Sequence, residues 1–405
     1  MAAMVSGRNR GEQEMTKERM TIPRNEYDER ISKIQEAMKE QDIDLLITHA
    51  CECESATVRY LSNFWAVFDF VGILVPREGK PILLTGGPES YDFAVQFAQT
   101  GDVRIHPMYV ETSAPEWDKP TNACNYQMIL DEIRERFPIK KIGVANVNTI
   151  PHEIMKDLIS GAQGAQIVPA EELVMKVRRY KSANEIMMLR EAYRITEEAM
   201  KEAAEMIRPG VREWEIEAAW RAAAYRMGAE GTGYPIWVTS GPATYQSLCK
   251  STERVIGENE MVQLTFGAKY GGYCGNLVRP VVLGNLPQKQ EDMIRVALDC
   301  LGETIDVMKP GVPFASVYDT FQARLRKEGF EGLTLYGPAH GTGMQECEGP
   351  WVDNRTGMVL EPNMVFNVDI WIADNEFGVR FEDGVLVTET GLEQLTTWNR
   401  GAIRK

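Results

Sequence analysis

Positive charge is scarce in this chain of 405 residues. It has 44 Lys and Arg against 59 Asp and Glu, so its formal net charge is 44 − 59 = −15. Nucleic acids and anionic membranes both attract basic surfaces, so this balance argues against either as a partner. Only four residues are His, which leaves few imidazoles available for catalysis. We therefore expect a small-molecule substrate rather than nucleic acid or a membrane.

Long apolar runs are also missing. No stretch is long enough to span a bilayer, and the polar start, residues 1–20, lacks the apolar centre of a signal peptide. The seven Cys show no repeated spacing, which favours free thiols in a reducing compartment. We predict a cytoplasmic protein without a cofactor and a mobile N-terminal segment at residues 1–20.

Helical and strand-like patterns alternate in the first half of the chain. Helical spacing at 26–40 is followed by a short apolar run at 43–48, and residues 71–76 and 81–85 read as a hairpin. Further helices are predicted at 91–99 and 127–136, and strands at 142–145 and 167–169. The alternation predicts an α/β domain over residues 21–173.

A long helical pattern covers residues 174–205. Within it, Ser182 precedes Glu185 by three residues, which is the capping-box spacing that starts a helix. We place the second domain at residues 174–405. It contains a faint repeat, because 206–228 and 307–329 both run from a basic residue through Pro-Gly-Val into a helix that ends at Gly. The pattern indicates two related halves.

Three C-terminal segments carry the candidate chemistry. The first, 263–280, contains Thr265-Phe266-Gly267 and then Gly272-Tyr273-Cys274-Gly275-Asn276-Leu277-Val278-Arg279 on a predicted hairpin. The second, 338–350, contains His340-Gly341 and Glu348-Gly349-Pro350. The third, 366–391, carries Asp369 on one predicted strand and Gly378-Val379-Arg380-Phe381-Glu382-Asp383 on another.

These segments resemble the pita-bread family of creatinase, prolidase and aminopeptidase P. The resemblance implies an α/β N-terminal domain followed by an α+β pita-bread catalytic domain. In metallopeptidases of that fold, two Asp, one His and two Glu hold a pair of divalent ions. The matching positions here are Thr265, Asn276, His340, Asp369 and Glu382. Two ions carry four positive charges and need several carboxylates, so we predict no metal site.

The candidate site residues follow from these motifs and from the resemblance. His340 exchanges protons near neutral pH, and carboxylates beside it suit acid–base work. The predicted catalytic residues are His340, Asp369, Glu382 and Glu348. The predicted substrate-binding residues are Thr265, Asn276, Tyr273, Arg380, Phe64 and Trp65. The last two belong to an aromatic region that, in the resembling families, approaches the neighbouring subunit's site, which implies a homodimer.

Three functions remain open. The leading hypothesis is a metal-independent hydrolase of a non-peptide C–N bond in a small guanidino, amidine or amide compound, similar to creatinase or ectoine hydrolase. Creatine itself is disfavoured, because Leu248 and Val278 stand where the resemblance implies a catalytic His and a guanidinium-binding Glu. The alternatives are an Xaa-Pro-type metallopeptidase with an altered metal site, and a catalytically inactive binding protein.

Overall fold

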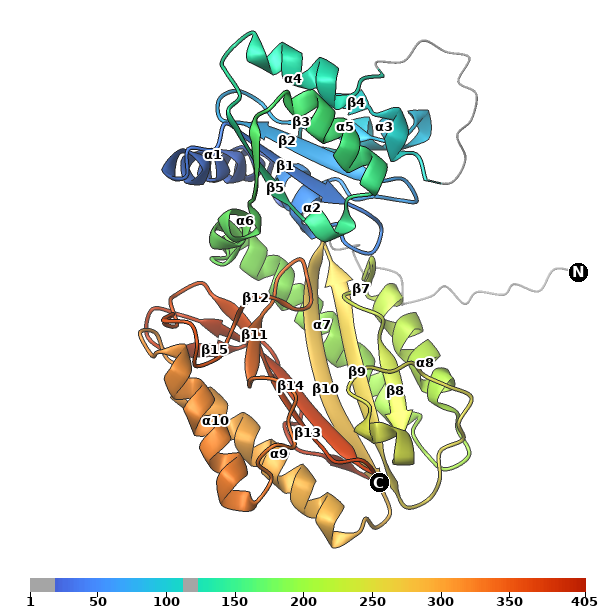
Figure 1. The fold of residues 1–405 in the computed structure, drawn as a ribbon. Helices are drawn as coiled ribbons and strands as arrows, with labels where there is room; N and C mark the ends of the chain where they lie inside the picture. Colours follow the sequence, from blue (N-terminus) through green and yellow to red (C-terminus); the bar gives the residue numbers. More distant parts are fainter. Residues whose placement is uncertain (1–18, 112–122) are drawn as a thin grey trace, which may run out of the picture.

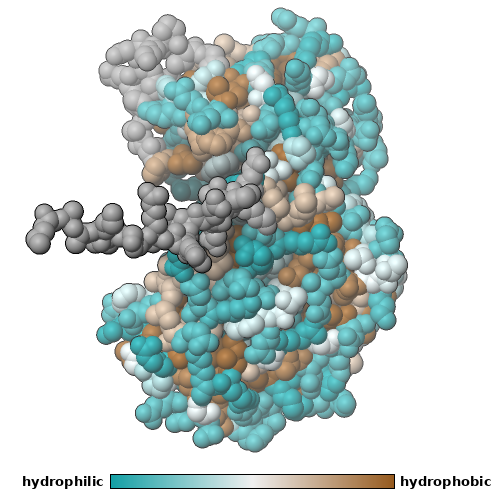
Figure 2. Space-filling view, turned by 180° about the vertical axis from the view of Figure 1, so that it is seen from behind, coloured by the Kyte–Doolittle hydropathy of each residue, from teal (hydrophilic) through white to brown (hydrophobic). Residues whose placement is uncertain are grey.

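The computed structural model describes residues 19–111 and 123–405, and it has two parts, one above the other in Figure 1. The predicted mobile segment, 1–20, therefore lies outside the described residues except for Arg19 and Met20. Hydrophilic residues cover most of the face seen in Figure 2. Among the described residues, no helix combines the length and the apolar character that crossing a membrane requires.

The N-terminal part is a six-stranded mixed sheet with the strand order β4-β3-β2-β1-β5-β6. The predicted hairpin is present, since β2 and β3 pair antiparallel. The strands are β1 (Leu45–Ala50), β2 (Val71–Pro76), β3 (Ile82–Thr85), β4 (Asp102–Ile105), β5 (Lys141–Ala145) and β6 (Gln166–Pro169). The helices are α1 (Arg24–Glu40), α2 (Ala56–Ser62), α3 (Pro88–Phe97), α4 (Tyr126–Arg134), α5 (His152–Ala162) and α6 (Glu171–Arg178).

The long helical pattern is split in two. It forms α6 and α7 (Ala183–Glu205), and α7 begins with the predicted capping box between Ser182 and Glu185. The predicted domain boundary between residues 173 and 174 falls inside α6. Polar contacts join the two parts: Ser182 Oγ donates to Glu26 Oε1 at 2.7 Å, and Arg30 Nη2 donates to Tyr273 Oη at 3.0 Å.

The C-terminal part is built on a ten-stranded sheet. Its main path runs β12-β11-β13-β14-β10-β9-β7, with β8, β15 and β16 attached to β9, β14 and β10. The strands are β7 (Gly231–Thr232), β8 (Trp237–Ser240), β9 (Glu260–Tyr270), β10 (Tyr273–Leu283), β11 (Ala339–Gly341), β12 (Glu348–Trp351), β13 (Val365–Ala373), β14 (Gly378–Val387), β15 (Leu392–Gln394) and β16 (Ile403–Arg404). The helices after α7 are α8 (Glu213–Arg226), α9 (Gln288–Val307) and α10 (Phe314–Glu328).

The faint sequence repeat corresponds to two similar halves. In the first, α7 packs on α8 and on the hairpin β9–β10, and in the second, α9 packs on α10 and on the hairpin β13–β14 (Figure 1). The two hairpins meet where β10 pairs with β14. All seven Cys are free, as their spacing predicts. The fold is therefore the expected α/β domain followed by an α+β pita-bread domain, with the join of the two halves at the centre of the large sheet.

Candidate active site

One row of residues crosses the four central strands. Thr265 on β9 pairs with Val278 on β10, Val278 pairs with Glu382 on β14, and Glu382 pairs with Asp369 on β13. Directly paired residues on neighbouring strands point to the same side of a sheet. The register therefore places Thr265, Glu382 and Asp369 on one face, although they are far apart in the sequence.

Strand alternation adds two more side chains to that face. Residues two apart on a strand point to the same side, so Asn276 joins Val278 on β10, and Arg380 joins Glu382 on β14. His340 reaches the face from β11, where it pairs with Asn367, two residues before Asp369.

The face forms the wall of a cavity of about 770 Å³. The cavity wall includes five of the predicted site residues, so His340, Asp369 and Glu382 do share one cleft, together with Thr265 and Arg380. Further residues line it: Tyr234, Pro235, Trp237, Leu248, Cys249, Lys250, Leu335, Tyr336, Gly337, Ala339, Glu346, Cys347, Trp351, Val352, Asp353 and Arg355.

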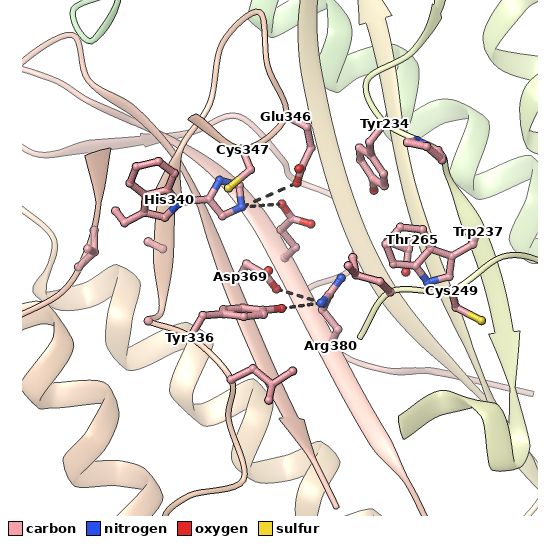
Figure 3. Close-up of a pocket in the computed structure, with 18 of the residues that line it drawn as sticks. Tyr234, Trp237, Cys249, Thr265, Tyr336, His340, Glu346, Cys347, Asp369 and Arg380 are labelled. Carbon is pink, nitrogen blue, oxygen red and sulfur yellow. Dashed lines mark hydrogen bonds and ion pairs between the residues drawn. The ribbon is translucent and has the colours of Figure 1, made fainter. Parts of the chain in front are cut away.

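His340 stands at the centre of the acidic groups. Its Nδ1 lies 3.0 Å from the carbonyl oxygen of Gly341, and its Nε2 lies 3.8 Å from both Glu346 Oε1 and Glu382 Oε1 (Figure 3). Burial lowers the pKa of His340, but the neighbouring side chain of Cys347 and the two carboxylates outweigh burial and raise the pKa well above its ordinary value. The ring is thus suited to holding a proton.

The pKa values of the two carboxyl groups beside His340, those of Glu382 and Glu346, are also raised. Burial, reinforced by the neighbouring charges of Asp369 and Glu346, raises the pKa of Glu382 well above its ordinary value. Burial also raises the pKa of Glu346. Because like charges crowd a poorly solvated space, the cavity favours a proton or another cation among these groups.

Arg380 supplies the compensating positive charge. Its Nε lies 3.4 Å from Asp369 Oδ1, its Nη2 donates to Tyr336 Oη at 2.5 Å, and its guanidinium lies 5.0 Å from the centre of the Trp371 ring. Burial lowers the pKa of Arg380, but the carboxylate of Asp369 outweighs it, so the net pKa is raised. Asp369 therefore pairs with a permanent cation, whereas Glu382 faces the titratable imidazole of His340.

Several buried polar atoms have no hydrogen-bond partner among the described residues. They include Thr265 Oγ1, Asn276 Oδ1, Glu382 Oε1 and the hydroxyl of Tyr234. A buried polar atom without a partner is costly. Tyr234, Thr265 and Glu382 line the cavity, and Asn276 lies just behind them. Their unpaired polar atoms indicate that the cavity binds a polar ligand.

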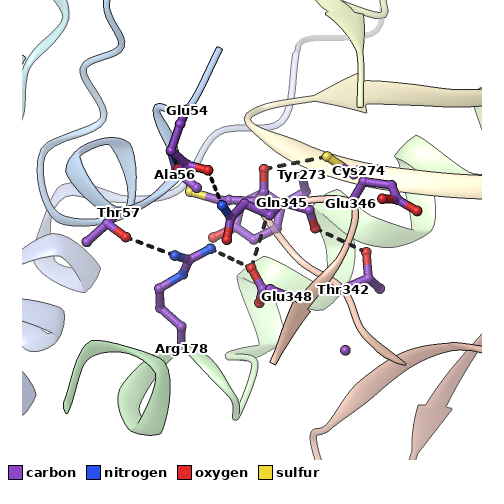
Figure 4. Close-up of polar contacts among 12 residues, drawn as sticks. Glu54, Ala56, Thr57, Arg178, Tyr273, Cys274, Thr342, Gln345, Glu346 and Glu348 are labelled. Atoms are coloured by element: carbon purple, nitrogen blue, oxygen red, sulfur yellow. Dashed lines mark hydrogen bonds and ion pairs between the residues drawn. The ribbon is translucent and has the colours of Figure 1, made fainter. Parts of the chain in front are cut away.

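Glu348 lies away from this cavity, although the sequence predicted it as catalytic. It is buried in an ion pair with Arg178 (Figure 4), and its Oε1 also accepts from Lys181 Nζ at 2.8 Å. Burial raises the pKa of Glu348, but the two cations outweigh burial and lower it. Both oxygens of this carboxylate are paired, and they tie β12 to Arg178 at the end of α6 and to Lys181 between α6 and α7.

Tyr273, Phe64 and Trp65 also lie outside the cavity within one chain. Tyr273 is buried and donates to Glu185 Oε1 at 3.0 Å. Phe64 and Trp65 both pack edge-on against Phe93 in the N-terminal part. Their predicted contact with a second subunit stays a prediction. Asn276 is buried just behind the wall, where its Nδ2 donates to the backbone carbonyl of Glu346 at 3.4 Å.

The sequence interpretation missed Glu346. The signal was present, because Glu346 stands two residues before Glu348 in the same short segment, but only the motif position was considered. Tyr336, Tyr234 and Trp237 were missed as well, since they come from loops or strand ends that carry no motif. Of the described residues, His340, Glu346 and Glu382 form a group whose ligand atoms all lie within 4.8 Å of one another, close enough to hold one metal ion.

Comparisons with known proteins identify related peptidases and two matching family models. A model of metallopeptidase family M24 matches residues 187–389, and one of the creatinase/prolidase N-terminal domain matches residues 30–180. The Xaa-Pro dipeptidase of Pyrococcus horikoshii is 23% identical over 377 residues, covering 93% of this chain and 99% of the relative. An uncharacterised peptidase of Bacillus subtilis is 28% identical over 264 residues, covering 65% of this chain and 74% of the relative.

Solved structures agree on the fold. The prolidase of Pyrococcus horikoshii OT3 superposes with a TM-score of 0.79 at 22% identity, covering 93% of this chain and 100% of that one. The Xaa-Pro dipeptidase of Bacillus anthracis superposes with a TM-score of 0.79 at 24% identity, covering 94% of this chain and 100% of that one.

Proposed function

The chain belongs to the pita-bread family of creatinases, prolidases and aminopeptidases P, and we propose that it hydrolyses a C–N bond in a small cationic molecule by acid–base catalysis at His340. One observation carries the proposal. Along the row of residues that crosses the central strands, Thr265 and Val278 are neutral, whereas Glu382 and Asp369 are acidic and lie in the same cavity as His340.

The residues present do not fit a pair of divalent ions. Two such ions bring four positive charges, and Arg380 adds a fifth beside Asp369. The carboxylates beside His340 and Arg380 are Asp369, Glu382 and Glu346. Thr265 and Asn276, which stand at the other two positions of the metallopeptidase pattern, are neutral. The deficit leaves more positive charge than the oxygen ligands can balance.

The same charges suit an organic cation. When His340 and Arg380 are protonated and the three carboxyls are ionised, the group carries one net negative charge. A guanidino, amidine or amino group would balance it, close to the rings of Tyr234, Trp237 and Tyr336. Thr265 Oγ1 and Asn276 Oδ1 are free to bond the polar atoms of that substrate.

His340 performs the proton transfers in this proposal. With Nδ1 directed at the Gly341 carbonyl, Nε2 is the nitrogen that takes a proton from water and returns it to the leaving nitrogen. Glu346 and Glu382 stabilise the imidazolium that forms between these two steps. Arg380 and Tyr336 hold Asp369 in place, so its carboxylate is available to orient the substrate cation.

The second candidate is an Xaa-Pro-type metallopeptidase with an altered site. The group His340, Glu346 and Glu382 could hold a single ion, and within the described part of the chain the buried Glu382 Oε1 has no hydrogen-bond partner. A bound divalent ion would supply Lewis-acid polarisation of a substrate carbonyl. The relatives named Xaa-Pro dipeptidase favour this candidate over the first, whereas the neutral residues Thr265 and Asn276 favour the first.

Metal content and substrate preference together separate the two candidates. We would measure the metals of the purified tag-free protein by elemental mass spectrometry, then assay chelator-treated protein against guanidino, amidine and amide compounds and against Xaa-Pro dipeptides. The first candidate predicts turnover of a small cationic compound without metal and no gain from Mn²⁺, Co²⁺ or Zn²⁺. Near-stoichiometric metal, with turnover of dipeptides alone and only after metal is restored, would replace the first candidate with the second.

We also propose a homodimer that closes the cavity. Large apolar residues are exposed at its mouth, including Leu248, Leu335 and Trp351, and Phe68 is exposed at the tip of a loop in the N-terminal part. A second copy of the chain would bury both groups. Light scattering should give twice the chain mass, and Phe68→Asp should shift the protein toward the monomer. A monomer with full activity would contradict the proposal.

A further inference from the structure

Cys347 lies in the cavity beside the catalytic imidazole. Figure 3 shows its sulfur next to the ring of His340. Both line the cavity, and Cys347 is exposed to it. We propose that Cys347 is a catalytic nucleophile with His340 as its base, a role that rests on the proposed hydrolase function and makes the reaction covalent.

The hydrogen bonding of His340 suits a base for this thiol. Its Nδ1 lies 3.0 Å from the Gly341 carbonyl oxygen, an atom that only accepts hydrogen bonds, so Nδ1 carries the proton and Nε2 is the basic nitrogen. Glu346 and Glu382 lie 3.8 Å from Nε2 and stabilise the ring once it is charged. A nucleophile, a base and groups that stabilise the charged base are the elements that covalent catalysis needs.

The chemistry balances with water as the only co-reactant. The Cys347 thiol gives its proton to His340 Nε2, and the thiolate sulfur forms a bond to the electrophilic carbon of the amide or amidine. The C–N bond breaks as His340 returns the proton to the leaving nitrogen. Water then attacks the resulting thioester or thioimidate, His340 takes its proton, and the C–S bond breaks to restore the thiol.

Unpartnered groups are present to bind the reacting carbon's substituents. Thr265 is 1% exposed and Glu382 is 2% exposed, and in both residues a cavity-lining oxygen lacks a hydrogen-bond partner among the described residues. The hydroxyl of Thr265 is a donor for a developing oxyanion. The carboxylate of Glu382 is an acceptor for a protonated nitrogen.

Cys249 provides a comparison within the same cavity. It lines the wall but bonds Gln246 Oε1 at 3.0 Å rather than an imidazole. Burial raises the pKa of Cys249, which makes it a poorer nucleophile at neutral pH. Cys53, in the N-terminal part, is exposed and serves as a control for solvent access.

Alkylation tests the pair without needing the substrate. The full chain, treated with chelator and held at neutral pH, would be exposed to iodoacetamide, and modification of each Cys followed by peptide mass spectrometry. We expect Cys347 to react at least about tenfold faster than Cys249 and Cys53, and His340→Gln to remove the difference, because the imidazole supports the thiolate. Equal rates for all three, or no change in His340→Gln, would overturn the proposal.

A second probe detects the covalent intermediate itself. After acid quenching of a reaction with p-nitrophenyl acetate, the parent should carry one acetyl group on Cys347, and Cys347→Ser should carry none there. Cys53→Ser is the matched control and should acylate as the parent does. No acetyl on Cys347 in the folded parent would overturn the nucleophile while leaving proton transfer by His340 intact. Acetylation of Cys347 in a protein that hydrolyses no C–N substrate would overturn the proposed function alone.

Discussion

The two halves of the C-terminal part differ in the residues that they place on the cavity face of the shared sheet: those of the first half are neutral, and those of the second half are charged. In the half with β9 and β10, Thr265 lines the cavity, and Val278 and Asn276 lie on the same face of the sheet. In the half with β13 and β14, the lining residues are Asp369, Glu382 and Arg380. Both hairpins are fully paired and their strands are almost entirely buried. The pairing and burial of the strands therefore do not depend on whether the side chains at the cavity are charged.

The difference separates what holds the fold from what makes the site. The halves are joined by a buried ion pair of Arg279 with Asp383, in which Nη2 lies 2.5 Å from Oδ1, and this pair faces away from the cavity. The wall itself carries atoms without a hydrogen-bond partner among the described residues, such as Thr265 Oγ1 and Glu382 Oε1. The pair that joins the halves is therefore matched within the chain, whereas part of the wall is left to bind a ligand.

Removing the imidazole should give the largest effect, because the charged half acts through it. We expect His340→Gln to reduce kcat by about 10³-fold, the usual contribution of a positioned acid or base, with the melting temperature nearly unchanged. Turnover of the compound identified in the substrate screen measures the effect. His152→Gln, at an exposed His in the N-terminal part, is the control and should keep full activity. Activity retained in His340→Gln would remove this residue from the mechanism.

Replacing Glu348 should chiefly affect stability. Glu348→Ala leaves the buried cations of Arg178 and Lys181 without their carboxylate, which costs about 3–5 kcal/mol in the free energy of unfolding. Urea unfolding measures this value. Glu361→Ala, at an exposed residue, is the matched control and should cost less than about 1 kcal/mol. A small cost for Glu348→Ala, together with lost turnover, would return Glu348 to the catalytic role that the sequence suggested.

Much of this arrangement could be predicted from the sequence. The Gly-Tyr turn and Arg279 predicted the hairpin of β9 and β10, which the structure has. The assignment of Thr265 and Asn276 to the positions where related metallopeptidases hold metal stays a prediction. His340, Asp369 and Glu382 were expected in one cleft and lie there. Motifs locate residues on strands well, because alternation and pairing then determine the direction of each side chain.

Motifs do not encode which neighbours a side chain contacts. Glu346 and Glu348 are two residues apart, yet one lines the cavity and the other is paired with Arg178 from the end of α6. Which of the two glutamates meets Arg178 depends on how α6 packs against the segment that contains them. Tyr336 reaches Arg380 from a loop whose path depends on long-range packing. A single sequence states neither of these contacts.

Restoring acids in the neutral half would sharpen the comparison. In metal-free protein, Thr265→Asp with Asn276→Asp adds two buried carboxylates near Glu382 and Glu346, and we expect a loss of about 3 kcal/mol in the free energy of unfolding. Mn²⁺ should recover the loss and bind near two per chain by elemental mass spectrometry. Thr265→Val with Asn276→Leu is the uncharged control and should gain nothing from metal. A double Asp variant that binds no more metal than the parent would mean that the two halves differ in more than these side chains.

The smallest expected effect is a dependence of stability on pH. Burial and the charge of Asp369 raise the pKa of Glu382 in the folded chain, so the folded state holds this proton more tightly than the unfolded state. Its stabilising contribution is complete below the unfolded pKa of about 4.3 and is lost as pH rises through the folded pKa. Gln cannot ionise, so in chelator-treated protein Glu382→Gln should melt above the parent at pH 8, by on the order of 3 °C.

That advantage should shrink toward zero near pH 4, where the carboxyl of the parent is protonated in both states. Melting temperatures of parent and variant at several pH values measure the trend, and Glu361→Gln, at an exposed position, should show none. An advantage that instead grows toward acid pH would mean that Glu382 is ionised and paired in the folded protein. Glu382 would then be a charge matched within the chain, like Asp383 beside Arg279. The proposed difference between the charges that join the two halves and those that bind a ligand would be wrong.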